Sequence, residues 1–157
     1  METCTFAELI AKRRDLEGMI RGAIRMRDRS YSPYSRFAVG ALIAVDNHEG
    51  WPGSARLWFG GCNVENRIYV VTHAEQSAIA QMIAKIGATP KPVIARVVVA
   101  CASDGPALPC GLCLQWIAEF GTANTEIFGV RLAQDGEEIL GVACTTLGEL
   151  LPYAFAL

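Results

Sequence analysis

The chain has 157 residues, a length at which one domain can bury about 70% of the surface of its unfolded chain. Apolar residues make up 52% and charged residues 19%, which excludes an intrinsically disordered protein, and the net charge of −2 gives no sign of a polyanion partner. No apolar run reaches the roughly 20 residues that a membrane span needs. Segment 1–14 becomes basic before an apolar core of signal-peptide length has formed. We therefore expect a cytoplasmic protein with no membrane or nucleic-acid partner.

The first half of the chain is predicted to hold one helix and an antiparallel hairpin. A capping-box pattern at Thr5 and apolar residues at helical spacing predict a helix over residues 5–28. Residues 37–45 and 56–62 are typical of two strands, joined by a turn-rich tip in which His48 is expected to be an ordinary exposed side chain. A glycine pair near the end of the second strand permits a close backbone approach.

The second half is predicted to alternate helices with strands. Its expected elements are a helix over 72–86, a buried strand over 93–102, a helix over 110–120, strands over 126–132 and 138–142, and a short helix over 147–151. A polar break over residues 63–67 precedes them. The resulting order, αββαβαββα, predicts an α/β fold with a mixed sheet covered by helices, in one domain over residues 1–157.

Two short segments carry groups that bind metals. His73 lies at one predicted helix start, and Cys110 and Cys113 lie in the first turn of another, where positions i and i+3 share a face. Thiols in a reducing compartment are more often metal ligands or catalytic groups than a disulfide framework when they form a Cys-x-x-Cys pair. Three ligands leave one position of a tetrahedral zinc open for water, and Glu75 is placed to move protons beside it.

Each of these residues could instead have a purely structural role. Thr72 and Glu75 have capping-box spacing, so Glu75 could serve only to cap its helix, and the two cysteines could be small buried residues. Their occurrence together, with Pro109 before the first cysteine, favours a catalytic zinc site instead. The other cysteines are expected to be structural thiols, namely Cys4, Cys62, Cys101 and Cys144.

The pattern His-x-Glu followed by Pro-Cys-x-x-Cys is the signature of zinc-dependent base deaminases, and here the sequence resembles the cytidine deaminase family. The likeness extends to residues 33–41, which are similar to the family's first-strand motif, to residues 61–66, which are similar to its ribose-binding motif, and to residues 149–155 at its C-terminal end. The resemblance implies a three-layer fold with a mixed five-stranded sheet flanked by helices.

The resemblance also implies roles for substrate-binding residues. Asn63 and Glu65 would hydrogen-bond the ribose hydroxyls, although on their own they are typical turn residues. Phe37 would line the pocket near the base or the sugar, with core packing as its alternative. Phe155 would reach the site of a neighbouring subunit, since the family forms homo-oligomers. A homotetramer is therefore expected, with a homodimer as the other possibility.

The reaction implied is hydrolytic deamination of cytidine or deoxycytidine to uridine or deoxyuridine and ammonia, a step of pyrimidine salvage. Glu75 would take a proton from the attacking water, protonate N3 of cytosine and then deliver a proton to the departing amine at C4.

The chain departs from the short members of the family at three places. Many of them have a third cysteine followed two positions later by Glu and then Arg, whereas this chain has His73 and Gln76. Two thiolates and a neutral imidazole balance a zinc ion, so no arginine is needed there. Leu114 stands in place of an arginine, and Arg67 stands where a small residue is usual. The last two differences bear on which substrate is used.

The sequence is also compatible with three other functions. The chain could deaminate a modified cytosine nucleoside, such as an N4-substituted cytidine or an antibiotic of the blasticidin type. It could be a nucleoside-binding or zinc module without catalysis, against which the intact Glu75 argues. It could also be an enzyme that acts on nucleic acid. The only support for this is that half of the 14 basic residues lie in the first predicted helix or directly after it.

Overall fold

A computed structural model of the chain describes residues 1–46 and 56–155. The predicted hairpin tip, including His48, lies outside these residues. Of the helices in the described ranges, none combines the length and the apolar character needed to cross a membrane.

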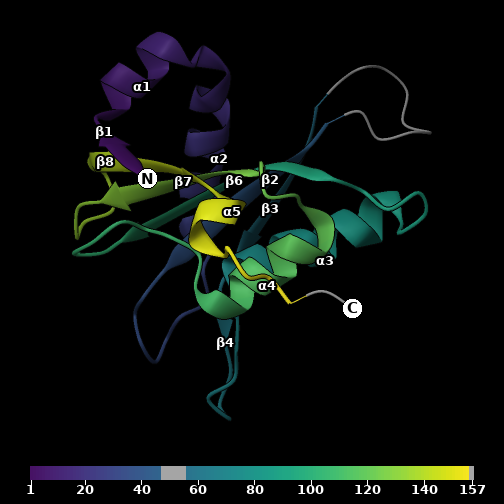
Figure 1. Cartoon of the computed structure of the whole chain (residues 1–157). Coiled ribbons are helices and arrows are strands. Elements are labelled where there is room, and N and C mark those ends of the chain that lie inside the picture. Colours follow the sequence, from purple (N-terminus) through teal and green to yellow (C-terminus); the bar gives the residue numbers. More distant parts are fainter. Residues whose placement is uncertain (47–55, 156–157) are drawn as a thin grey trace.

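One mixed sheet forms the centre of the molecule (Figure 1). Its strands, in spatial order, are β1 (Glu2–Cys4), β8 (Ile139–Thr146), β7 (Glu126–Leu132), β6 (Ile94–Ala102), β2 (Val39–Val45) and β3 (Leu57–Cys62). The pair β6 and β7 is parallel and the other pairs are antiparallel. The predicted α/β class and mixed sheet are confirmed. The predicted count of five strands is wrong by one, because β1 is a three-residue edge strand with no apolar pattern of its own, formed by pairing with β8.

Helices cover both faces of this sheet and make three layers (Figure 1). One face carries α1 (Phe6–Lys12), a short 3-10 turn η1 (Arg14–Leu16) and α2 (Glu17–Arg27); the other carries α3 (Ala74–Ile86), α4 (Gly111–Phe120) and α5 (Leu147–Leu150). Alternate residues of the central strands face the two layers, so that Val98 packs under α2 and Val97 and Val99 pack under α3 and α4. Because both faces are covered, the central strands are mostly apolar along their length.

The single helix predicted over residues 5–28 is wrong, because the chain leaves helical geometry at Arg13, with φ −135° and ψ 67°. The Arg13 guanidinium bonds both carboxylate oxygens of Glu126 on β7, at 2.9 and 3.1 Å. Nothing local marks this break, since no proline or glycine stands there. The predicted capping box at Thr5 is confirmed and begins α1.

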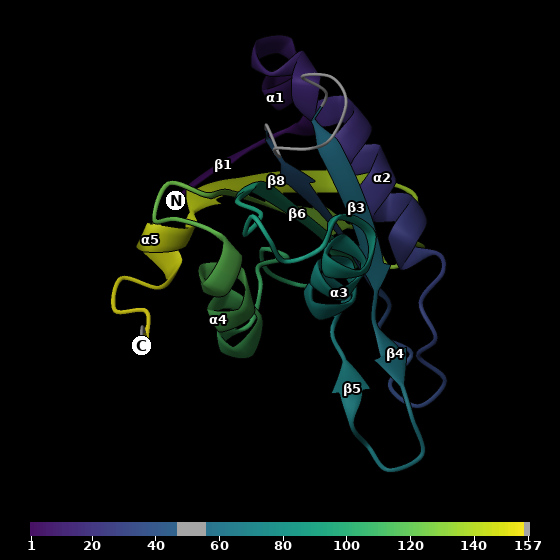
Figure 2. The same cartoon turned by 90° about the vertical axis from the view of Figure 1, so that its right-hand side faces the viewer.

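A small second hairpin occupies the segment that was expected to be only a polar break. Its strands β4 (Val64–Glu65) and β5 (Val71–Thr72) pair antiparallel, and it projects away from the main sheet (Figure 2). The backbone of Tyr31 braces it, accepting the N–H of Glu65 at 2.8 Å and donating to the carbonyl of Asn63 at 3.1 Å. The hairpin escapes pattern analysis because its strands are two residues long and it is held by a distant loop.

The close backbone approach expected at the glycine pair occurs at Gly61 on β3. A Cβ atom there would lie 2.3 Å from the carbonyl oxygen of Ala74 and 2.3 Å from the amide nitrogen of Ala78. Only glycine allows α3 to approach the strand this closely. Gly61 therefore sets the position of the first turn of α3, where the functional residues begin.

Candidate zinc site and substrate cavity

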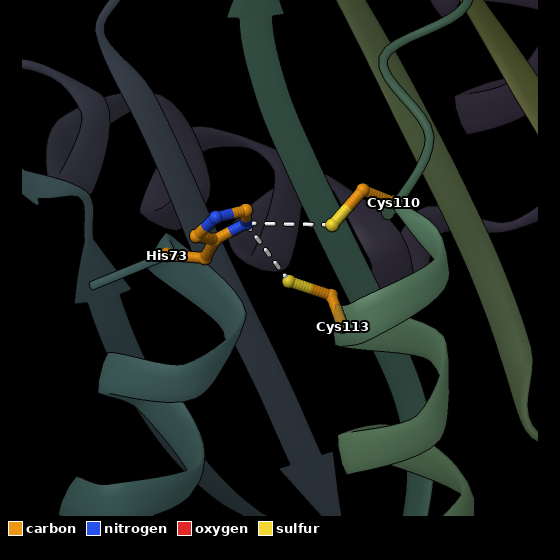
Figure 3. Close-up of side chains that lie close together, drawn as sticks. All are labelled: His73, Cys110 and Cys113. Atoms are coloured by element: carbon orange, nitrogen blue, oxygen red, sulfur yellow. Dashed lines mark hydrogen bonds between the residues drawn. The ribbon is translucent and has the colours of Figure 1, made fainter. Parts of the chain in front are cut away.

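The predicted metal group lies where the N-termini of α3 and α4 meet (Figure 3). Strand β6 connects these two helices and leads from one to the other along the sheet. His73 and Cys110 are the residues that cap the two helices, with extended backbones, and Cys113 lies in the first turn of α4. Both helices thus begin one or two residues later than predicted. An N-cap residue and the residue three positions on point their side chains to the same place, which brings the two thiols together.

The three ligand atoms have a spacing that suits a tetrahedral ion. Nδ1 of His73 lies 3.4 Å from Sγ of Cys110 and 3.3 Å from Sγ of Cys113, and all three atoms lie within 4.8 Å of one another. Tetrahedral zinc with ordinary Zn–N and Zn–S bonds would separate such atoms by about 3.5 Å. The geometry and the N/S donor set therefore fit zinc with three protein ligands.

The electrostatic surroundings of Cys113 also favour a bound metal cation. Burial, followed by the nearby Glu75 carboxylate and the second thiol of Cys110, raises the pKa of Cys113 well above its ordinary value. A buried thiolate beside a carboxylate needs a positive partner. A divalent cation would supply it and would deprotonate both thiols.

Glu75 does not cap its helix. The side chain that bonds back to the N-cap is that of Gln76, whose Oε1 accepts the His73 N–H at 3.0 Å. Glu75 is instead buried beside the metal group, with 4% of its surface exposed, and lines a cavity. The capping role considered for Glu75 is therefore wrong, and Gln76 has a structural function of its own.

The cavity next to the metal group has a volume of about 420 Å³, within the range of small-molecule sites. Phe37, Asn63 and Glu65 line it together with His73, Glu75 and Cys110. Among its described lining residues the charged side chains are the two carboxylates, and neither lysine nor arginine contributes.

Asn63 and Glu65 are buried polar residues that also line this cavity, each about 6% exposed. The Ser35 hydroxyl donates to Glu65, as do the backbone N–H groups of Tyr34 at 2.8 Å and Ser35 at 3.2 Å. These bonds, the Ser35 hydroxyl first, lower the pKa of Glu65 and keep it ionised at neutral pH. Ser35 was missed as a site residue; its place beside Phe37 in the first-strand motif was the signal available.

Four other predicted residues have different surroundings. Phe37 is 47% exposed at the cavity wall, so its alternative as a core residue does not hold. Phe155 is 73% exposed and does not line this cavity; its backbone pairs with the side chain of Gln115 on α4, at 3.2 and 3.4 Å. Leu114 is buried in the core against α3, and exposed Arg67 lies outside the cavity lining. Neither of the last two is placed to select a substrate within this chain.

Comparison with known proteins identifies the class. The sequence profile of the cytidine and deoxycytidylate deaminase zinc-binding region matches residues 13–129, so the chain belongs to this family, as the motifs predicted. A cytidine deaminase of Sporosarcina psychrophila is 34% identical over 143 residues, covering 90% of this chain and 92% of that protein. One of Halalkalibacterium halodurans is 36% identical over 142 residues, covering 90% and 94%. The crystal structure of cytidine deaminase from Burkholderia pseudomallei superposes with a TM-score of 0.70 at 31% identity, covering 88% of this chain and 97% of that one.

The purified protein should hold one zinc ion per chain, and Cys110→Ser should lose most of it after dialysis against a chelator, because two ligands hold the ion too weakly. Elemental analysis by mass spectrometry measures this. Cys101→Ser is the matched control: Cys101 is also a cavity-wall thiol but lies outside the ligand group. Equal zinc in Cys110→Ser and the control would refute the assignment.

Proposed function

We propose that this protein is a zinc-dependent cytidine deaminase, which hydrolyses cytidine or deoxycytidine to uridine or deoxyuridine and ammonia. The observation that carries the proposal is the arrangement of one cavity. Its lining combines Glu75 and two of the three candidate ligands, His73 and Cys110, with the buried polar pair Asn63 and Glu65. The first group suits attack on a base and the polar pair suits a sugar. The named relatives are cytidine deaminases, which agrees with this division.

The chain's own residues divide the work of the reaction. Zinc, when bound, supplies Lewis-acid activation of water and so allows a nucleophile to form at neutral pH. Glu75 accepts the first proton that the water gives up and donates it to N3 of cytosine. It then takes the second proton from the hydroxyl added at C4 and passes it to the amine, so that the C4 carbonyl forms as the C4–N bond breaks and ammonia leaves. Its burial beside the ligands, in the lining of the cavity, supports this role. Asn63, Glu65 and Phe37 orient the nucleoside, so that C4 is presented to the metal group.

The substrate is proposed to be a nucleoside rather than a nucleotide. The two carboxylates of the cavity repel a phosphate, and its described lining offers no cation to bind one. We propose further that residues 1–157 act as one catalytic domain in pyrimidine salvage, in the cytoplasm. Reducing conditions there keep Cys110 and Cys113 available as ligands.

We also propose a homo-oligomer, with four subunits preferred over two. Large apolar side chains are exposed on the β4–β5 hairpin, where Ile68 is 77% and Tyr69 86% exposed, and on the neighbouring loop at Tyr34. Leu112 and Trp116 form a second exposed apolar pair, one turn apart on α4. Such surfaces are typical of subunit interfaces. Phe155, held outward by Gln115, is then available to the cavity of a neighbouring subunit.

A substrate panel tests the reaction itself. Cytidine and deoxycytidine should lose their cytosine-type ultraviolet absorbance and release ammonia, while the 5′-monophosphates should react with a kcat/KM at least about 100-fold lower, because of charge repulsion. N4-methylcytidine and a blasticidin-type antibiotic complete the panel. Preference for either of these would identify a modified nucleoside as the substrate. No ammonia from any compound, and no methylamine from N4-methylcytidine, would indicate a binding module.

Glu75→Gln tests the proton transfers. The substitution keeps the shape of the side chain but removes the group that accepts the proton, so kcat for cytidine should fall about 10³-fold or more. Zinc content should stay at the wild-type value, because Glu75 is not a ligand. Glu119→Gln, on the exposed side of α4, is a matched control for the loss of one carboxylate. Near-normal turnover by Glu75→Gln would disprove the mechanism.

The subunit number can be measured by light scattering on a sizing column. Wild type should elute with the mass of four chains of 16.9 kDa, and Ile68→Glu should form smaller species, because a charge would be buried at the hairpin contact. Val93→Glu changes an apolar residue exposed away from the hairpin and should not alter the mass. A monomeric wild type would contradict the proposed assembly, and a mass of two chains would favour the dimer.

A further inference from the structure

Ser30 lies in the loop after α2, thirty-three positions from Asn63, and bonds directly to the Asn63 side chain. Its Oγ is 2.6 Å from Oδ1 of Asn63. Ser30 is absent from the cavity lining, and no motif of the sequence singled it out. It therefore acts on the cavity only through Asn63.

The backbone determines how the Asn63 amide is oriented. The N–H of Val39 can only donate, and it lies 2.8 Å from Oδ1. The carbonyl of Phe37 can only accept, and Nδ2 lies 2.8 Å from it. The oxygen and nitrogen of the side chain are thus assigned without ambiguity, and the Ser30 hydroxyl must donate to Oδ1.

Counting the groups that remain shows what Asn63 can offer a ligand. Oδ1 has two lone pairs, which are taken by Val39 and Ser30, while Nδ2 has one N–H left after its bond to Phe37. Asn63 is therefore limited to the donation of one hydrogen bond.

Glu65 has the opposite hydrogen-bonding capacity to Asn63. As an ionised carboxylate it can only accept, and three of its roughly four acceptor sites are occupied by Ser35 and the backbone of Tyr34 and Ser35. One donor and one acceptor thus remain in this part of the cavity lining. A single hydroxyl group satisfies both, because it accepts and donates at once.

We infer that Ser30 is a positioning residue for substrate recognition: by occupying the second lone pair of Asn63 Oδ1, it makes Asn63 a pure donor and so restricts this subsite to a sugar hydroxyl. The inference rests on the proposed function. Without the Ser30 hydroxyl, Oδ1 has a free acceptor position, and the amide is held by two bonds instead of three.

The test compares Ser30→Ala with wild type on cytidine and on 2′,3′-dideoxycytidine, which lacks both ribose hydroxyls at this end. Ser30→Ala should lower kcat/KM for cytidine about 3- to 10-fold, mainly through KM, in line with one net hydrogen bond. For the dideoxy compound kcat/KM should change less than about 2-fold. Ser30→Thr keeps a hydroxyl and should restore the wild-type ratio. Ser32→Ala removes a hydroxyl that meets Ser30 but not Asn63, and should behave as wild type.

Equal losses on both substrates, or no loss on either, would overturn the role of Ser30. If Ser30→Ala does not fold, Ser30→Cys, which has nearly the same size but is a weaker donor, must show the selective loss in its place. Wild type without activity on cytidine would overturn the proposed function instead. In that case calorimetry can still test the role of Ser30, because it measures binding at the same subsite without turnover. Ser30→Ala should then bind uridine more weakly than wild type does and bind 2′,3′-dideoxyuridine equally well.

Discussion

The close packing of α3 against β3 is the constraint on which the site depends. Gly61 leaves no side chain between the strand and the first turn of the helix, so the backbone at Ala74 approaches the strand directly. With the helix held there, its N-cap His73 and the buried Glu75 face the cavity beside the end of β6. The crossover through β6 then brings the N-terminus of α4, with its two thiols, to the same place. The position of the metal group thus follows from how the backbones of these elements pack.

Two carboxylates in one small cavity suit different tasks because their neighbours differ. Glu65 accepts hydrogen bonds from Ser35 and two backbone amides, which hold it ionised and in place. Glu75 lies among the ligand thiols, where it opposes ionisation of Cys113 unless a cation is present. The first arrangement suits a fixed acceptor and the second suits a proton carrier next to a metal. The absence of basic side chains from the described lining follows the same logic, since a neutral nucleoside needs none.

Local patterns were enough to predict much of this. The ligand group has short sequence spacings within each segment, and the mostly apolar stretches over residues 93–102 and 126–132 are typical of strands. The fold class and the three candidate ligands therefore followed from the sequence. Features that depend on long-range contacts did not follow. At the break in the first helix, Arg13 bonds to Glu126 on a distant strand, and β1 forms by pairing with β8. Gln76, rather than Glu75, caps α3 because the helix begins one residue later than the capping-box spacing suggested. The bond between Ser30 and Asn63 joins segments that no spacing rule connects.

The central claim is that three protein ligands hold the metal and leave one position for the reacting water. X-ray absorption at the zinc edge measures this directly in the purified protein. The account predicts two sulfur neighbours at about 2.3 Å, together with one imidazole nitrogen and one further light atom at about 2.0–2.1 Å. A shell of three or four sulfur atoms, or a second imidazole in the fourth position, would contradict it, because the metal would then have no place for water.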